Sequence, residues 1–112
     1  MFKAKNTICA GIGLLLLCSA CEQTPSHIIA PEQMETLLVD IHKAEAIADN
    51  IPQYATNEAK EQLRQSVFDR HDVTQAQFDT SLIWYSEHMT KYSQIYEKVT
   101  ARLKEEDDAV KT

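Results

Sequence analysis

The chain has 112 residues, of which 17 are acidic and 11 are basic, and its formal net charge is −6. This length allows one small domain and excludes two. The acidic balance argues against a nucleic-acid-binding protein, which needs a basic surface for the phosphates, and against electrostatic attraction to anionic lipid headgroups.

The first twenty residues have the pattern of a bacterial signal peptide. Lysines at positions 3 and 5 precede an apolar run over residues 7–17, and small residues at positions 19 and 20 lead directly to Cys21. The run is shorter than the about 20 apolar residues that span a bilayer. We therefore predict that residues 1–20 are a lipoprotein signal peptide, which is removed from the mature chain.

Cys21 is the predicted site of lipidation. Lipid-processing sites usually carry Leu three residues before the modified cysteine, whereas this chain has Cys18 at that position. An ordinary secretory signal cleaved nearby and an uncleaved membrane anchor therefore stay as alternatives. On the lipoprotein interpretation, Cys21 carries covalent diacylglycerol and an N-acyl chain such as palmitate, and several acyl chains anchor a protein permanently. We expect no other cofactor.

Maturation changes both the charge and the number of cysteines. Loss of the two lysines in the signal leaves nine basic residues against 17 acidic ones, a net charge of about −8. Loss of Cys9 and Cys18 leaves Cys21 as the single cysteine, so no internal disulfide can form and a zinc site of several cysteines is excluded. The domain must then fold through side-chain packing alone.

Residues 21–30 are expected to form the lipidated cysteine and a short tether. As a flexible coil, the tether would reach about 15–17 Å and hold the domain close to the membrane. Glu22 is the only acidic residue beside Cys21. Export to the cell surface in some bacteria depends on an acidic cluster there, and Glu instead of Asp after the cysteine is typical of outer-membrane lipoproteins in enteric bacteria. We therefore predict that the protein lies on the periplasmic face of the outer membrane.

Residues 31–104 are expected to form an all-α domain, a small bundle of three to four helices. The first helix begins at Pro31, where a missing N–H costs nothing. It ends before Pro52, because the residue before a proline is pushed out of the helical region. Its apolar residues recur at steps of three and four and define one inward stripe, formed by Met34, Leu37, Leu38, Ile41, Ala44, Ala48 and Ile51.

Two threonines are predicted to cap the next two helices. Thr56 precedes the second helix, which residues 71–73 end. Thr74, with Gln77 three residues later, forms a capping-box pattern before a third helix from Gln75 to about Ser86. The inward residues of these two helices are expected to be Ala59, Leu63, Val67, Phe68, Phe78, Leu82 and Tyr85.

The fourth helix has the clearest repeat, a heptad seam of apolar residues. The seam consists of Met89, Tyr92, Tyr96, Val99 and Leu103. It can pack inside the bundle or pair with a second copy, and for so short a stretch we favour the intramolecular bundle. Residues 105–112 are expected to be an acidic, flexible tail.

His42 and Glu45 are the candidate metal ligands, because they stand three residues apart on one helical face. One such pair supplies too few ligands, so we expect no metal site. His71 and Asp72 are adjacent, an arrangement that rarely orients a general base, and no nucleophile stands on a sharp turn. The sequence therefore predicts that the protein is not an enzyme.

Aromatic residues are concentrated in the second half of the mature chain. Trp84, Tyr85, Tyr92 and Tyr96 have large areas and polar groups, which are typical of protein interfaces. They are the candidate partner-binding residues. The alternative is that all of them fill the core, which a small domain without disulfides needs.

Several blocks of the mature chain form one pattern in order and spacing. They are Pro31-Glu32-Gln33-Met34, residues 37–46 (Leu-Leu-Val-Asp-Ile-His-Lys-Ala-Glu-Ala), Val67-Phe68, His71, Phe78-Asp79, Ser81-Leu82, Trp84-Tyr85, Ile95-Tyr96, Val99 and Leu103. Together these blocks resemble domain of unknown function 4296, a family of short lipoproteins from the Bacteroidetes. The resemblance spans nearly the whole mature domain. It implies an all-helical domain anchored in the envelope, and it supplies no activity and no catalytic residue.

These observations predict a lipid-anchored, non-enzymatic envelope lipoprotein that acts as an adaptor or accessory subunit of another envelope protein. A self-associating structural lipoprotein, with the seam of the fourth helix as the interface of a homo-oligomer, is the first alternative. A bundle that binds a metal or small ligand at His42 and Glu45 is the second. We expect no nucleic-acid partner.

Overall fold

The computed structural model describes residues 23–111, so the predicted signal peptide and Cys21 lie outside the described residues. Within these residues four α-helices follow one another: α2 (Pro31–Asn50), α3 (Asn57–Arg70), α4 (Gln75–Ser86) and α5 (Met89–Lys111). A short 3₁₀ turn, η1 (Pro52–Tyr54), joins α2 to α3. The prediction of a small all-α bundle is confirmed.

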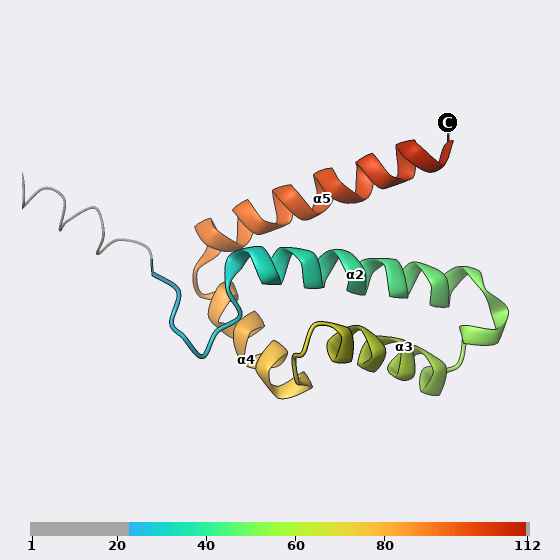
Figure 1. Cartoon of the computed structure of the whole chain (residues 1–112), viewed down its shortest axis with the longest axis horizontal. Coiled ribbons are helices and arrows are strands. Elements are labelled where there is room, and N and C mark those ends of the chain that lie inside the picture. The colour runs from blue at the N-terminus through green and yellow to red at the C-terminus, as the bar shows by residue number, and fades with distance from the viewer. Residues whose placement is uncertain (1–22, 112) are drawn as a thin grey trace, which may run out of the picture.

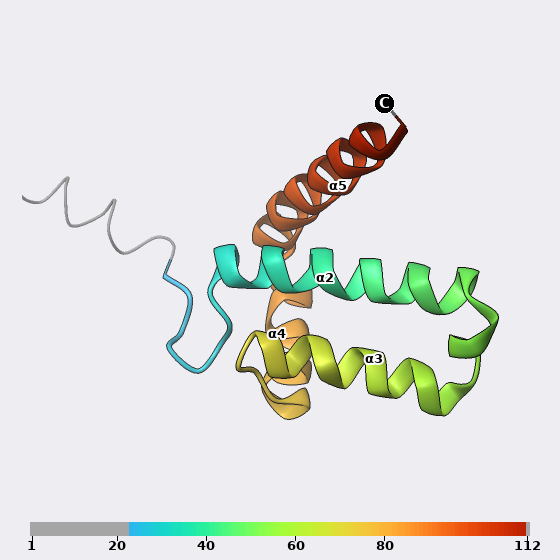
Figure 2. The same cartoon turned by 45° about the vertical axis from the view of Figure 1, so that its right-hand side comes forward.

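Helix α2 is the central element of the bundle. Helix α3 runs back along one side of α2, and α5 lies along another side (Figure 1). Helix α4 crosses at the end where α2 begins and connects α3 to α5 (Figure 2). Helices α2 and α5 approach each other near their N-termini and diverge toward the C-terminus of α5 (Figures 1 and 2).

The predicted N-termini of α3 and α4 and the predicted C-terminus of α2 are confirmed by local structure. The Thr56 hydroxyl accepts a hydrogen bond from the Ala59 N–H at 3.1 Å, and the Thr74 hydroxyl accepts one from the Gln77 N–H at 3.0 Å. Each threonine satisfies a donor that the first turn of its helix leaves unpaired. Ile51 is extended before Pro52, with φ −118° and ψ 112°, so α2 ends there.

The turn between α3 and α4 reverses the chain without a glycine. Asp72 has φ 55°, in the left-handed region. The Val73 N–H donates to the Phe68 carbonyl at 3.0 Å and the Asp72 N–H donates to the Asp69 carbonyl at 3.2 Å. This pair of bonds is a Schellman motif, and burial of Val73 supplies the hydrophobic contact that often accompanies it. The motif ends α3 and sets the direction of α4.

The core draws residues from all four helices. Its buried members are Ile28, Ile29, Met34, Leu37, Leu38, Val39, Ile41, Ala44, Val67, Phe68, Val73, Phe78, Tyr85, Ile95 and Val99. Two residues of the predicted apolar stripes are largely exposed instead. Ile51 lies beyond the end of α2 and is 38% exposed, and Met89, the first residue of α5, is 59% exposed. Both predictions were wrong because these residues lie at helix ends, outside the packed part of the bundle.

Helix α2 is buried on two faces, whereas the sequence predicted one stripe. At 3.6 residues per turn, Val39 lies opposite Ala44 and Ala48, yet it is completely buried. It lies between Thr36 and Lys43, whose side chains both bond residues of α5. The second buried face therefore exists because α5 covers it.

The ends of the domain differ from the boundaries expected from the sequence. Ile28 and Ile29, in the segment expected to be a tether, are 5% and 2% exposed and belong to the core. At the other end, α5 continues to Lys111, through residues expected to form a flexible tail. Glu106 in this last part bonds Lys43 of α2 at 2.7 Å.

Candidate functional site

Six rings form a continuous series of contacts from α4 through α5 to α2, which we call the aromatic ladder. The order of the contacts is His88, Trp84, Tyr85, Tyr92, Tyr96 and His42. His88 stacks on Trp84 with centroids 3.8 Å apart, and Trp84 meets Tyr85 edge-on at 5.0 Å. Tyr92 meets Tyr96 edge-on at 4.9 Å. Three of the four aromatic candidates, Trp84, Tyr92 and Tyr96, are partly exposed along this series.

Tyr85 is the exception, because it is completely buried. Its hydroxyl donates to the Ile29 carbonyl at 2.7 Å. One turn earlier on α4, the buried Ser81 hydroxyl accepts a hydrogen bond from the Ile29 N–H at 2.9 Å. Burial raises the pKa of Tyr85 above its usual value of 10.0. Tyr85 therefore connects the N-terminal segment, residues 23–30, to α4 and has no surface to offer a partner.

Tyr92 and Tyr96 form the middle of the ladder on α5. Burial, and then a hydrogen bond and charge repulsion with Tyr96, raises the pKa of Tyr92 to about 12. The Tyr92 phenol is therefore neutral at physiological pH. Neutral phenols present an apolar ring together with a hydrogen-bonding group, which suits a surface that a protein covers.

The last turn of α4 and the first residue of α5 carry exposed apolar side chains beside the ladder. Ile83 is 61% exposed and Met89 is 59% exposed. We call residues 83–89 the α4–α5 corner. It contains Trp84, whose indole ring packs between His88 and Tyr85. The corner thus combines two exposed aliphatic side chains with an aromatic stack.

His42 and Glu45 share a helical face but contact different neighbours. The His42 ring meets Tyr96 edge-on at 6.2 Å. The Glu45 carboxylate pairs with Arg64 of α3 at 3.7 Å. Among residues 23–111, no group of three or more His, Cys, Asp or Glu side chains is placed to hold a metal ion.

His71 has a carboxylate partner that the sequence did not reveal. Its Nε2 lies 2.7 Å from Asp40 Oδ2, and both side chains are mostly buried. The His71 carbonyl accepts a hydrogen bond from Gln33 Nε2 at 3.3 Å. Gln33 and Asp40 stand seven residues apart, which places both side chains on one face of α2. This spacing is the feature of the sequence from which the contact with His71 could have been predicted. Asp40, and not the metal-ligand candidates His42 and Glu45, is therefore the α2 side chain that bonds His71.

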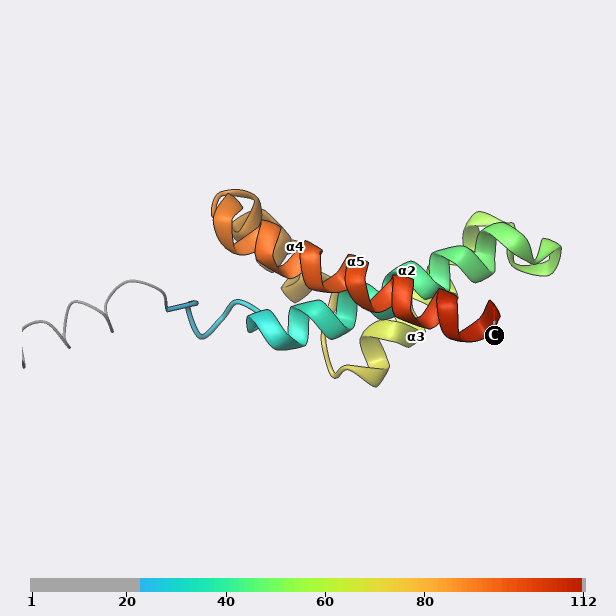
Figure 3. The ribbon, with the colours of Figure 1, turned by 90° about the horizontal axis from the view of Figure 1, so that it is seen from above.

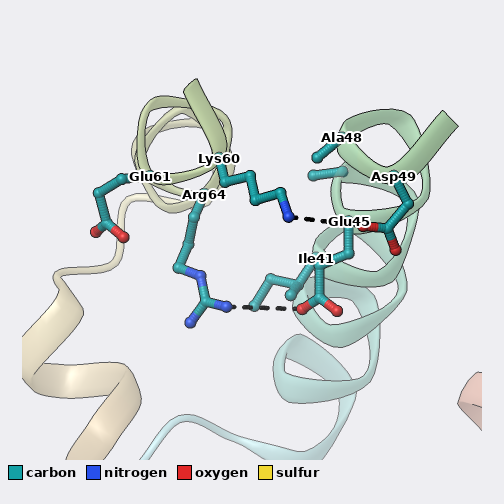
Figure 4. A pocket seen from close by; sticks show the side chains of 8 residues that line it. Ile41, Glu45, Ala48, Asp49, Lys60, Glu61 and Arg64 are labelled. Atoms are coloured by element: carbon teal, nitrogen blue, oxygen red, sulfur yellow. Dashed lines mark ion pairs between the residues drawn. The ribbon is translucent and has the colours of Figure 1, made fainter. Parts of the chain in front are cut away.

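A groove of about 260 Å³ lies between α2 and α3. Ile41, Ala44 and Ala48 form its apolar part. Arg64 reaches Glu45, and Lys60 reaches Asp49 at 3.9 Å, so two ion pairs cross it (Figure 4). Four charged side chains of the groove thus form ion pairs between the two helices, and Glu61 also lines the groove.

A family model described as Domain of unknown function (DUF4296) matches residues 25–109. This chain belongs to that family. The match extends from the N-terminal segment almost to the end of α5. A search of curated proteins and a search of solved structures found no match. Within the part of this family member that the structure describes, no helix is both long enough and apolar enough to span a membrane.

Proposed function

We propose that this protein is a lipid-anchored, non-enzymatic adaptor that binds another envelope protein. In this proposal Cys21 carries diacylglycerol and an N-acyl chain, and the domain lies on the periplasmic face of the outer membrane. The sequence pattern before Cys21 supports the anchor. The aromatic ladder supports the binding role.

The ladder is the observation on which the adaptor role rests. Trp84, Tyr92 and Tyr96 are partly exposed, and each is held by ring contacts to its neighbours. Tryptophan and tyrosine dominate binding energy at protein interfaces, because they bury large areas and lose few rotamers on binding. Their fixed positions lower the entropy that binding would cost. Tyr85 is not part of this surface, because it is buried.

The His71–Asp40 pair has a structural explanation that agrees with a non-enzymatic role. It joins α2 to the turn between α3 and α4, and the same turn accepts a hydrogen bond from Gln33. The proposed adaptor therefore uses this pair to hold its helices together.

Self-association through the α5 seam is the less favoured alternative. Ile95 and Val99 in the middle of α5 are already buried within one copy, and Arg102 bonds α2. Val99 is the buried member of the seam, so a dimer that packed the whole seam as a heptad interface would have to remove α5 from α2. The proposal therefore takes an unlike protein as the partner.

The test is recovery of a partner by crosslinking in intact cells, followed by purification from detergent-solubilised membranes. Trp84→Ala should reduce recovery of a specific partner at least about tenfold, because loss of one interface hot spot costs more than about 1.4 kcal/mol. Tyr54→Ala is the matched control, since Tyr54 is also partly exposed but lies in η1. Thermal unfolding must show that both variants fold. Equal recovery with all three proteins, or no specific partner with any, would contradict the adaptor role.

A further inference from the structure

Helix α3 packs into the core only near its C-terminus. Its buried residues, Val67 and Phe68, lie in its last turn. Within residues 57–64 no side chain of α3 is buried. The facing residues of α2, Ala44 and Ala48, are buried but small. The two helices therefore leave between them the groove of about 260 Å³, which we call the α2–α3 groove.

No other helix lines the α2–α3 groove in the part of the chain that the structure describes. The C-terminal end of α2 and η1 extend away from α5 in the side and top views (Figures 1 and 3). The charged side chains of the two ion pairs across the groove are between 40% and 71% exposed. The groove is therefore open to a small molecule from solvent.

The two walls of the groove carry opposite charges. Helix α2 supplies Glu45 and Asp49, which stand four residues apart and so share a helical face. Helix α3 supplies Lys60 and Arg64 at the same spacing. Figure 4 shows that both cations point across the groove to the carboxylates of α2, whereas the Glu61 carboxylate points away from α2. The groove thus has an anionic wall, a cationic wall and an apolar part between them.

The two ion pairs across the groove are too long to be hydrogen bonds. Their charged atoms are 3.7 and 3.9 Å apart, whereas charge-assisted hydrogen bonds have lengths of about 2.7–2.9 Å. Lys43 and Glu106, which join α2 to α5, are exposed to a similar degree and are 2.7 Å apart. Exposed ion pairs contribute little to stability. The four charged groups of the groove therefore keep hydrogen-bonding capacity for a ligand.

We propose that the α2–α3 groove binds a free α-amino acid with an aliphatic side chain. The ammonium group of the ligand donates hydrogen bonds to the two carboxylates of α2, and its carboxylate accepts hydrogen bonds from the two cations of α3. Its side chain lies on Ile41, Ala44 and Ala48. A ligand with one charge would leave one wall unmatched. The groove is smaller than the about 300–1,000 Å³ of pockets for drug-sized ligands, so the ligand is small.

The proposed site is separate from the aromatic ladder. The ladder reaches α2 at His42, which contacts Tyr96 of α5, whereas the groove lies between α2 and α3. The inference therefore does not rest on the adaptor role or on the lipid at Cys21. Failure of either part of the proposed function would leave the binding measurement valid.

Titration of L-leucine into the isotope-labelled full chain in detergent micelles, followed by NMR, tests the proposal. The amide signals of Ala44 and Ala48 should move, with half-saturation on the order of 1 mM, because a ligand of few atoms makes few contacts in an open groove. The amide signal of the exposed Ala101 on α5 should stay in place. Absence of movement, or equal movement of all three signals, would overturn the proposal. If the groove receives a segment of another protein instead, leucine moves no signal, which also overturns it.

Two analogues of leucine test the requirement for both charges. Isoamylamine lacks the carboxylate of leucine, and isocaproate lacks its ammonium group. Each should bind at least about fivefold more weakly than leucine, because it loses the hydrogen bonds to one charged wall. Glycine should also bind more weakly, because it has no side chain to cover the apolar part of the groove. Binding of either analogue as tightly as leucine would contradict a site for zwitterions.

Substitutions of the two walls complete the test. Glu45→Gln and Arg64→Gln each remove one charge and should each raise the half-saturation concentration about fivefold. Glu58→Gln and Arg70→Gln are the matched controls, because both residues are exposed on α3 and neither lines the groove. The controls should bind leucine as the wild-type protein does. Thermal unfolding must show that all four variants fold. Equal affinity of the wall variants and the controls would show that the groove charges do not bind the ligand.

Discussion

The two faces of α2 are held in different ways. Toward α3, the alanines at positions 44 and 48 form an apolar surface, with ion pairs only at its rim. Toward α5, the buried Val39 is surrounded by polar contacts between the two helices. Arg102 bonds Glu35 at 3.4 Å, and Lys43 bonds Glu106. The comparison shows that a regular apolar stripe reveals in the sequence which face of α2 packs against a neighbouring helix. The face toward α5 mixes apolar and polar residues, so its burial could not be predicted from the sequence pattern.

The largest effect should come from the core on the α3 side. Phe68 is completely buried and its ring lies 5.2 Å from that of Phe78 of α4. Phe68→Ala removes a large buried ring and leaves a cavity, so the free energy of unfolding should fall by about 3–5 kcal/mol. Chemical denaturation measures this, with Ile51→Ala as the exposed control. A loss below about 1 kcal/mol would show that α3 does not depend on this core.

A smaller loss is expected from the apolar part of the α5 side. Val99 is 1% exposed. Val99→Ala removes two methyl groups' worth of buried surface and should lower the free energy of unfolding by about 2 kcal/mol. The neighbouring Thr100 is exposed, so Thr100→Ala is the control and should have little effect. Equal small effects of both substitutions would mean that α5 is not packed on α2.

The polar tie between α2 and the α3–α4 turn should contribute less again. Asp40→Ala removes the partner of the mostly buried His71 and should cost about 1–2 kcal/mol, because a buried polar group then loses its hydrogen bond. Asp49→Ala is the matched control on the same helix, since its ion pair with Lys60 is exposed. Urea denaturation of both variants compares them. If Asp49→Ala costs as much as Asp40→Ala, burial of the His71–Asp40 pair has no special role.

The smallest effect should come from the polar tie on the α5 side. Arg102 is half-exposed, with Glu35 and Thr36 as its partners. Arg102→Ala should cost about 0.5 kcal/mol, and the cost should shrink in high salt, because exposed ion pairs are screened. Arg70→Ala is a control at an exposed position. A loss above about 2 kcal/mol would mean that polar contacts, and not Val39 and Val99, hold α5.

The start of α3, the start of α4 and the end of α2 could be predicted because their signals are local. Thr56 and Thr74 bond N–H groups three residues away, and Pro52 restricts the residue before it. These effects do not depend on the rest of the fold. The all-α architecture followed from them and from the apolar stripes.

The features that the sequence did not predict depend on contacts between residues that are far apart in the chain. Val39 is buried because α5 covers it, and Asp40 meets His71 because α3 turns back along α2. Tyr85 has the chemistry of an interface residue, but 56 positions separate it from Ile29, whose carbonyl it bonds. The pattern of apolar residues within one helix gives no information about contacts between residues so far apart in the chain. The exposed positions of Trp84, Tyr92 and Tyr96 likewise depend on how α4 and α5 lie against α2.

Lipid attachment at Cys21 is the central claim, and metabolic labelling tests it most directly. Cells that express the full chain receive radiolabelled palmitate, and the protein is purified from the membrane fraction. The wild-type protein should carry the label, whereas Cys21→Ser should carry none and leave the membrane fraction. Unlabelled wild-type protein, or Cys21→Ser that stays with the membranes in the same amount, would contradict the account.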